Sequence, residues 1–116
     1  MNKEFKNSSL REEEQKAVQE FKQELYKIYG NRLLKIILYG SYARGDADYQ
    51  KSDIDILLVG KDFNNPSKEI DRIIEPMASI SLKYDILISV LPVTENDFLF
   101  QNTPLMLNVR KEGIEI

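Results

Sequence analysis

Apolar residues at helical spacing mark the first predicted element. Gly30 is a typical helix end, and Ser9 followed by Glu12 has the spacing of a capping box, so the pattern predicts an amphipathic helix over Leu10–Tyr29. Its apolar positions recur at steps of three and four residues: Val18, Phe21, Leu25 and Ile28. The charged residues between them are predicted to form a solvated face: Glu12, Glu13, Glu14, Lys16, Glu20, Lys22 and Lys27.

Three short runs of mostly branched apolar residues predict strands. The first covers Leu33–Tyr39 and is interrupted only by Lys35, which is typical of a strand buried on both faces. The second covers Asp53–Val59 and begins with acidic residues. The third covers Tyr84–Leu91, and we expect Pro92 to end it because proline lacks a backbone amide.

A helix is predicted between the second and third strands. Ser67 can cap it, and its apolar positions again keep helical spacing: Ile70, Ile73, Ile74, Met77 and Ile80. Pro76 lies inside this pattern. Because an internal proline removes a hydrogen bond and clashes with the preceding turn, we expect a kink or a break near residue 75.

The C-terminal part of the chain predicts two more helical segments. Thr94 with Asp97 indicates a short turn, and Thr103 before Pro104 places a cap and a first-turn proline ahead of a last helix that runs to about Glu112. Helices thus alternate with strands, so we expect an α+β fold in alternating α/β order, with a sheet of at least three strands packed by helices. All 116 residues are expected to form one domain, with residues 1–7 as a loose tail.

Composition restricts the chemistry that such a domain can perform. The chain has no histidine and no cysteine, which excludes Ser-His-Asp triads, thiol nucleophiles and disulfides. The remaining carboxylates, hydroxyls and backbone amides suit a hard cation such as Mg²⁺. A net charge of −3 opposes stable binding to nucleic acid. The sequence shows no membrane-length apolar run and no signal region, so a cytoplasmic protein with no membrane partner is expected.

Two acidic residues at the start of the second strand break a local rule. Aspartate is a poor strand residue, yet Asp53 and Asp55 lead an otherwise apolar strand. Strand positions two apart point to the same face, about 7 Å apart, so the two carboxylates would repel each other unless a divalent cation lay between them. The alternative is that Asp53 belongs to a turn and Asp55 points to water.

A polar turn follows the first strand directly. Ser41 can open a helix whose amides face an anion, Gly40 would let a phosphate approach the backbone, and Arg44 lies one helical turn later. The turn therefore predicts a phosphate-binding site, and its alternative is a plain strand-to-helix connection. Asp85, which leads the third strand, repeats the acidic anomaly. It would join the other carboxylates if the two strands are neighbours, or else simply keep a strand end soluble.

Together these segments resemble a known family. Tyr39-Gly40-Ser41-Tyr42-Ala43-Arg44-Gly45 followed by Ser52-Asp53-Ile54-Asp55 resembles the signature of the DNA polymerase β-type nucleotidyltransferase superfamily, and most closely its minimal nucleotidyltransferases, or MNT domains. The likeness covers essentially the whole chain and implies a small mixed sheet. The segment between Ser41 and Asp53 is one residue longer than in the commonest minimal form, which places an extra residue in the loop Asp46–Lys51.

The resemblance implies a role for each matching residue. It makes Asp53 and Asp55 paired metal ligands and Asp85 the third carboxylate, which helps to bind the catalytic metal and activates the acceptor hydroxyl. Ser41 and Arg44 match positions that contact the triphosphate of ATP, with backbone access at Gly40. Two Mg²⁺ ions would stabilise the attacking and leaving oxygens of an in-line displacement.

The acceptor and the partner stay open at this point. The leading hypothesis is transfer of AMP to a hydroxyl of a protein, since minimal members of the family often act as MntA-like antitoxins paired with a HEPN-type toxin. A second hypothesis is a non-catalytic module that neutralises such a partner by contact. Transfer to a small molecule such as an antibiotic is less favoured, because a chain of 116 residues leaves no second domain to hold that acceptor. A homo-oligomer is possible, but no sequence feature decides it.

Overall fold

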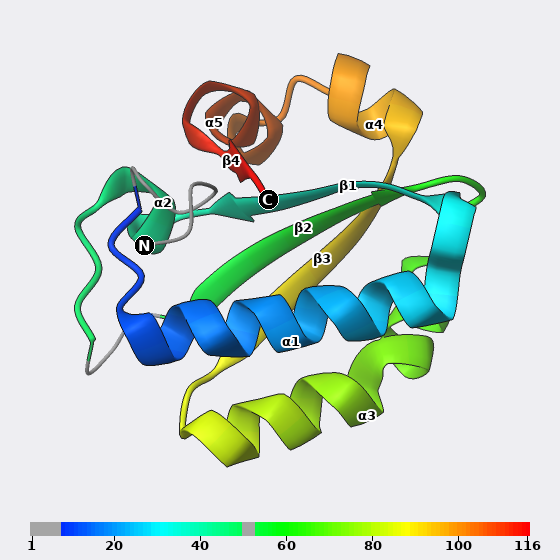
Figure 1. Cartoon of the computed structure of the whole chain (residues 1–116). Coiled ribbons are helices and arrows are strands. Elements are labelled where there is room, and N and C mark those ends of the chain that lie inside the picture. The colour runs from blue at the N-terminus through cyan, green and yellow to red at the C-terminus, as the bar shows by residue number, and fades with distance from the viewer. Residues whose placement is uncertain (1–7, 50–52) are drawn as a thin grey trace.

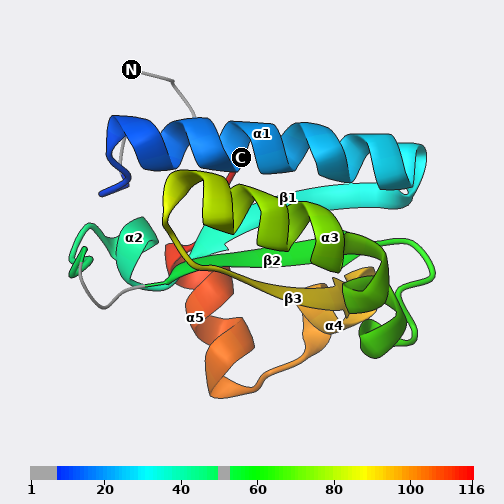
Figure 2. The same ribbon diagram turned by 90° about the horizontal axis from the view of Figure 1, so that it is seen from below.

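A four-stranded sheet lies between two layers of helices in the computed structural model, which describes residues 8–49 and 53–116. Helices α1 and α3 cover one face of the sheet, and α4 and α5 cover the other (Figures 1 and 2). The expected tail at residues 1–7 lies outside the described residues, as do the last two residues of the longer loop.

The sheet is mixed, with strand order β3-β2-β1-β4. Its strands are β1 (Leu33–Tyr39), β2 (Ile54–Gly60), β3 (Ile88–Thr94) and β4 (Ile114–Glu115). Strand β1 pairs antiparallel with both β2 and β4, whereas β2 and β3 are parallel. The fold class expected from the alternating pattern is therefore confirmed, and the short strand β4 is an addition to it.

Five α-helices and one 3₁₀ turn connect these strands in the described part of the chain. They are α1 (Glu12–Tyr29), the 3₁₀ turn η2 (Gly30–Arg32), α2 (Ser41–Arg44), α3 (Pro66–Tyr84), α4 (Glu95–Phe100) and α5 (Pro104–Glu112). The caps expected for the last two helices are confirmed, because Thr94 accepts from the amide of Asp97 and Thr103 from that of Met106. No helix in residues 8–49 and 53–116 is long and apolar enough to cross a membrane.

Strand β2 is buried on both faces because each face meets its own core. Ile54, Ile56 and Leu58 pack into the cluster formed with α1 and α3. Leu57 and Val59 pack into the second cluster, which includes Met106 and Val109 of α5. The alternation of side chains along a strand thus places Asp55, which has the same parity as Leu57, on the face covered by α5.

Helix α1 begins differently from the prediction. Its N-cap is Arg11, whose amide donates to Glu14 Oε1 at 2.8 Å, so the box predicted at Ser9 and Glu12 is wrong. The solvated-face prediction is also wrong for Glu14, which is only 1% exposed. At the other end of α1, Tyr29 is buried where Ile28 was expected to be, and Ile28 is exposed.

The third strand also has different bounds. The helical pattern of α3 continues to Tyr84, and Asp85 caps it in the left-handed conformation with φ 53°, which aspartate tolerates better than most residues. The strand begins only at Ile88 and passes through Pro92. Because β3 is an edge strand, proline can sit there without costing a ladder hydrogen bond, so the predicted end at Pro92 is wrong.

Helix α3 runs through its internal proline without a break. Its N-cap is Asn65, two residues before the predicted cap Ser67, and of the kink or break expected near residue 75 the break is absent. The carbonyl that Pro76 leaves unpaired belongs to the exposed Arg72, where water can satisfy it. Ile73 and Ile80 are buried as predicted, whereas Ile74 is 51% exposed.

Gly60 at the end of β2 is a specific test of this packing. A Cβ added there would lie 2.2 Å from the ring of Phe63, which is itself only 1% exposed and cannot move aside freely. We expect Gly60→Ala to lower the free energy of unfolding by about 1–3 kcal/mol, measured by urea denaturation. Lys61→Ala, at the neighbouring exposed position, is the control and should change it by less than about 0.5 kcal/mol. Equal stability of the two variants would contradict the proposed clash.

Candidate functional site

Five chain segments meet at one end of the sheet. The end of β1, helix α2 and the start of β2 lie together there, beside the first turn of α1 and near the end of α3 (Figure 1). The antiparallel register brings this about, because it sets Tyr39, the last residue of β1, opposite Asp55. All six residues predicted to carry chemistry belong to these segments or flank them.

Gly40 and Asp55 are in direct contact. A Cβ added at Gly40 would lie 2.5 Å from Asp55 Oδ2, so only glycine leaves room for the carboxylate at this point. Gly40 also has φ 75° as the N-cap of α2, a conformation that L side chains rarely adopt. Glycine is thus required here for two reasons, the close approach of Asp55 and the backbone conformation, while the approach of a phosphate stays a prediction.

The Asp55 carboxylate is electrostatically unfavourable in the protein alone. Burial raises its pKa above the ordinary value, and the negative charge of Asp53 raises it further, while Arg44 opposes both effects. The pKa of Tyr39 is raised by burial and by the charge of Asp55. Two neighbouring carboxylates, one of them partly buried, form an oxygen donor set that Mg²⁺ accepts, and a cation there would relieve their repulsion. The residues present therefore fit a divalent metal.

Arg44 lies at the end of α2 among several carboxylates. Its Nε is 3.3 Å from Asp46 Oδ2 and its Nη1 is 3.7 Å from Glu112 Oε2, at the end of α5. Both ion pairs are partly exposed to solvent, where such pairs contribute little free energy. A triphosphate can therefore replace these carboxylates as the partner of the guanidinium at small cost.

Ser41 opens α2 as the sequence predicts. The helix has only four residues, and the amides of Ala43 and Arg44 both donate to the Gly40 carbonyl at 3.1 Å. Gly45 ends it in the left-handed conformation with φ 84°. The turn thus places Ser41 and Arg44 within one short, tightly wound segment beside Asp55.

Asp85 lies in a different neighbourhood from Asp55. It lines a cavity of about 650 Å³ together with Asp53, with Glu14 of α1 and Tyr42 of α2, and with Arg11 and Tyr49, which lie outside these helices. Asp55 does not line this cavity. In residues 8–49 and 53–116 no three acidic side chains are grouped so that they could hold a metal ion. The structure thus joins Asp53 to both neighbourhoods, and the role of Asp85 stays a prediction.

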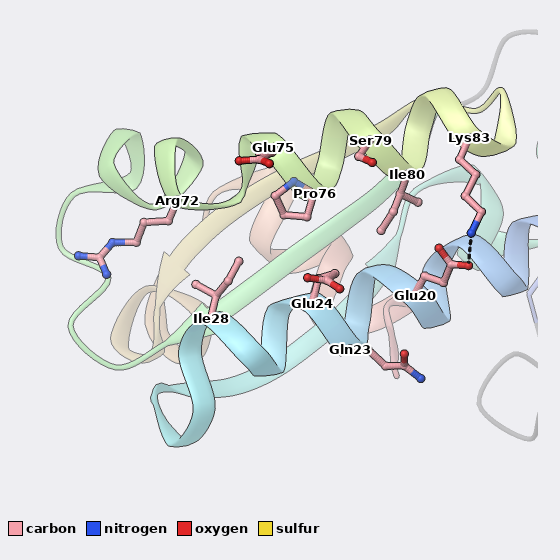
Figure 3. A pocket seen from close by; sticks show the side chains of 10 residues that line it. All are labelled: Glu20, Gln23, Glu24, Ile28, Arg72, Glu75, Pro76, Ser79, Ile80 and Lys83. Carbon is pink, nitrogen blue, oxygen red and sulfur yellow. Dashed lines mark hydrogen bonds and ion pairs between the residues drawn. The ribbon is translucent and has the colours of Figure 1, made fainter.

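A larger groove of about 790 Å³ runs between α1 and α3, away from these residues (Figure 3). It contains none of the predicted site residues. Charges of both signs line it, including Glu20 and Lys83, which pair at 2.8 Å, and Arg72 near its other end. Volume alone therefore does not locate the candidate site, whereas the convergence of predicted residues around α2 does.

Glu14 and Tyr42 were missed as members of this region. Glu14 was placed on the solvated face of α1, although it precedes Val18, Phe21 and Leu25 by four, seven and eleven residues and so lies on their stripe. That position is the signal that would have identified it as buried. Tyr42 directly follows the signature residues Gly40 and Ser41. It is 2% exposed, and its hydroxyl donates to the Glu14 carboxylate.

Comparisons with known proteins now identify the family. Residues 11–110 match the sequence family described as "Nucleotidyltransferase domain". This chain belongs to that family. The match spans the whole site, from the cap of α1 to the last turns of α5.

Two proteins of the archaeon Methanocaldococcus jannaschii are close relatives of this nucleotidyltransferase domain. One, named "Putative protein adenylyltransferase MJ0141", is 46% identical over 99 residues, which cover 85% of this chain and 94% of that protein. The other, named "Putative protein adenylyltransferase MJ0604", is 40% identical over 103 residues, which cover 86% and 94%. The likeness therefore extends over nearly the full length of both relatives.

Solved structures share the fold at lower identity. The structure described as "Crystal structure of the toxin-antitoxin with AMP-PNP" matches with a TM-score of 0.56 at 21% identity, covering 82% of this chain and 68% of that one. A structure of "the toxin-antitoxin MntA-HpeT mutant-D39ED41E" matches with a TM-score of 0.53 at 18% identity, covering 80% and 67%. These matches confirm the nucleotidyltransferase fold.

Because ionisation of Asp55 is unfavourable in the folded protein, removing its charge should raise the stability. We expect Asp55→Asn to raise the thermal midpoint of the protein without metal by a few degrees at pH 7, because the amide neither repels Asp53 nor resists burial. The folded-state pKa of Asp55 is raised, so ionisation costs stability as the pH rises. The gain should accordingly shrink as the pH falls and wild-type Asp55 takes up a proton.

Differential scanning fluorimetry across pH 3–8, the range that brackets an ordinary aspartate pKa, measures this effect. Asp71→Asn, at an exposed position of α3, is the matched control and should leave the midpoint nearly unchanged. An Asp55→Asn protein that is no more stable than wild type at pH 7 would contradict the electrostatic description of the site.

Proposed function

We propose that this nucleotidyltransferase domain transfers AMP from ATP to a hydroxyl group of a protein. One observation carries the proposal: the Asp53–Asp55 pair, whose crowding a divalent cation would relieve, lies against a glycine turn that ends in Arg44. Support for a protein acceptor comes from the relatives, which are named protein adenylyltransferases and match over 94% of their length.

The residues of the proposed site have separate tasks. Asp53 and Asp55 would hold Mg²⁺, with two ions expected, and the metal supplies charge neutralisation on the phosphate oxygens. Ser41 donates its hydroxyl to the triphosphate, and Arg44 exchanges Asp46 and Glu112 for phosphate oxygens. Gly40 keeps the backbone open, so that the phosphates and the Asp55 carboxylate can lie close together.

At the α-phosphorus, the reaction forms one bond and breaks one. The acceptor oxygen bonds to the α-phosphorus, the bond from that phosphorus to the bridging oxygen breaks, and pyrophosphate leaves. The hydroxyl proton goes to a carboxylate, and we assign this role to Asp85 because it shares a cavity with Asp53. For this it must lie within hydrogen-bond reach of the acceptor in the bound complex, a distance that can shorten on binding.

We further propose that the acceptor is a HEPN-type toxin and that this chain acts as its MntA-like antitoxin. Two of the solved structures with the same fold are described as toxin–antitoxin assemblies. Neutralisation by contact alone is the competing function.

Transfer of AMP to the partner tests the proposal directly. We expect the chain, incubated with ATP, Mg²⁺ and a HEPN-type protein encoded beside it, to add the mass of AMP to that protein, measured by intact mass spectrometry. Asp53→Asn and Asp55→Asn should each lower the rate more than about 100-fold, since each removes a charge that holds the metal. Asp71→Asn is again the control. Full neutralisation of the toxin by both inactive variants, with no AMP added, would favour the contact mechanism.

Asp85 requires its own test because it also caps α3. Asparagine and glycine both adopt the left-handed conformation readily. Asp85→Asn and Asp85→Gly should therefore keep the helix end and lose only the carboxylate. If Asp85 accepts the proton, both variants lower kcat by about 10²–10⁴-fold with little change in the KM for ATP. Wild-type turnover in both variants would restrict Asp85 to its structural role at the end of α3.

A further inference from the structure

A buried carboxylate links α1 to the phosphate-binding turn. Glu14 is 1% exposed, and its two oxygens accept four hydrogen bonds. Arg11 supplies three of them, from its amide at 2.8 Å, from Nε at 3.1 Å and from Nη2 at 2.8 Å. The fourth comes from the hydroxyl of Tyr42, which donates to Oε2 at 3.0 Å from inside α2.

The same region is bound a second time through the segment that precedes α1. The Ser9 amide donates to the Tyr42 carbonyl at 2.8 Å, and the Ser9 hydroxyl donates to the same oxygen at 3.3 Å. Tyr49 donates its hydroxyl to the Ser9 carbonyl at 2.6 Å, while the Arg11 guanidinium lies 3.9 Å from the centre of the Tyr49 ring. Side chain and backbone of Tyr42 are therefore both held by residues at the start of α1.

Helix α2 needs such support. Four residues are too few to form a stable helix on their own, yet α2 carries both Ser41 and Arg44. Tyr42 and Ala43 of α2 also pack into the apolar core, and Arg44 forms a partly exposed ion pair with Glu112 at 3.7 Å. That pair involves the guanidinium that a triphosphate would take, so it cannot keep α2 in place once a ligand is bound.

Burying the Glu14 carboxylate between α1 and α2 costs free energy unless hydrogen bonds compensate it. Burial raises the pKa of Glu14, but the hydrogen bonds from Arg11 and Tyr42 outweigh it, and the pKa lies below the ordinary value. The group is therefore ionised at neutral pH and requires all its donors. The Tyr42 hydroxyl completes this donor set, which gives the contact a directional specificity that apolar packing lacks.

We infer that Glu14 is a positioning residue for the phosphate-binding turn, acting through the Tyr42 hydroxyl to hold α2 where Ser41 and Arg44 can meet a triphosphate. The effect on ATP rests on the proposed function, whereas the effect on α2 does not. Glu14 touches no reacting atom. It fixes the distance between the first turn of α1 and α2.

The chain contains a matched control for this contact. Glu69, at the start of α3, is also buried, at 3% exposed. It accepts a hydrogen bond from the Tyr29 hydroxyl at 3.1 Å and pairs with Arg72 at 3.6 Å. This second combination of glutamate, tyrosine and arginine does not touch α2, so its loss should affect stability but not the turn.

The experiment compares Tyr42→Phe with Tyr29→Phe, each of which removes one hydroxyl from a buried glutamate. Amide hydrogen exchange of the nucleotide-free protein, followed by NMR, reports on α2 through the amides of Ala43, Arg44 and Gly45. We expect Tyr42→Phe to speed their exchange at least about fivefold, while Tyr29→Phe leaves it unchanged. Glu14→Gln should do the same relative to Glu69→Gln, and if Glu14→Gln does not fold, the tyrosine pair decides.

Steady-state AMP transfer provides the second measurement. Tyr42→Phe and Glu14→Gln should raise the KM for ATP about tenfold and change kcat less than about threefold, since uniform binding of the triphosphate is weakened. A merely structural contact would lower the unfolding midpoint in all four variants and move neither KM nor the exchange of α2.

Two results would overturn the inference. One is exchange of α2 in Tyr42→Phe that matches exchange in Tyr29→Phe. The other is faster exchange with an unchanged KM, which would separate Glu14 from the triphosphate. A wild-type protein that transfers no AMP would refute the proposed function instead, and the exchange comparison would still decide whether Glu14 positions α2.

Discussion

The antiparallel register of β1 and β2 is the constraint on which the site depends. It sets the last residue of β1 opposite Asp55, so the chain must turn immediately beside a carboxylate. Gly40 makes that turn possible, since a side chain there would occupy the space of Asp55 Oδ2. This contact sets where the turn that carries Ser41 and Arg44 begins. A shift of one residue in the register would move Asp55 to the opposite face of the sheet.

Two carboxylates near this turn show that the neighbouring groups, and not burial alone, decide the direction of a pKa shift. Asp55 has a negative neighbour in Asp53 and a raised pKa, so its charge is a cost that the folded protein carries. Glu14 has Arg11 and Tyr42 as donors and a lowered pKa, so its charge is stabilised. The first arrangement suits a carboxylate that must attract a cation. The second suits a group whose only task is to stay where it is.

Much of the fold followed from local patterns, whereas the errors at the third strand arose from its tertiary context. The amphipathic helix α1, with Val18, Phe21 and Leu25 buried, the strand after it and the caps at Thr94 and Thr103 are set by neighbours in sequence, and these predictions hold. The bounds of β3 were wrong because they depend on sheet position. An edge strand tolerates Pro92, and a helix can end on Asp85 in a left-handed turn. Neither the edge position of β3 nor the helix end at Asp85 can be predicted from the local sequence pattern.

The site shows the same division. The start of α2 at Ser41 matches the prediction, because it directly follows a strand end. The contact of Gly40 with Asp55 was not predicted, because it depends on the register of β1 and β2. The grouping of Asp85 with both other aspartates was expected from neighbouring strands, and the structure places it in a cavity with Asp53 alone. Glu14 was assigned to solvent because its charge was given more weight than its place on the apolar stripe.

The proline in β3 has a consequence for how molecules of this protein meet one another. Strand β3 forms the outer edge of the sheet, and Pro92 lies in its interior, opposite Leu58 of β2. An outer edge normally offers a ladder of donors to which a foreign strand can add. Here Pro92 offers no backbone N–H to an added strand. Aggregation through this edge is therefore discouraged without a charged residue at that position.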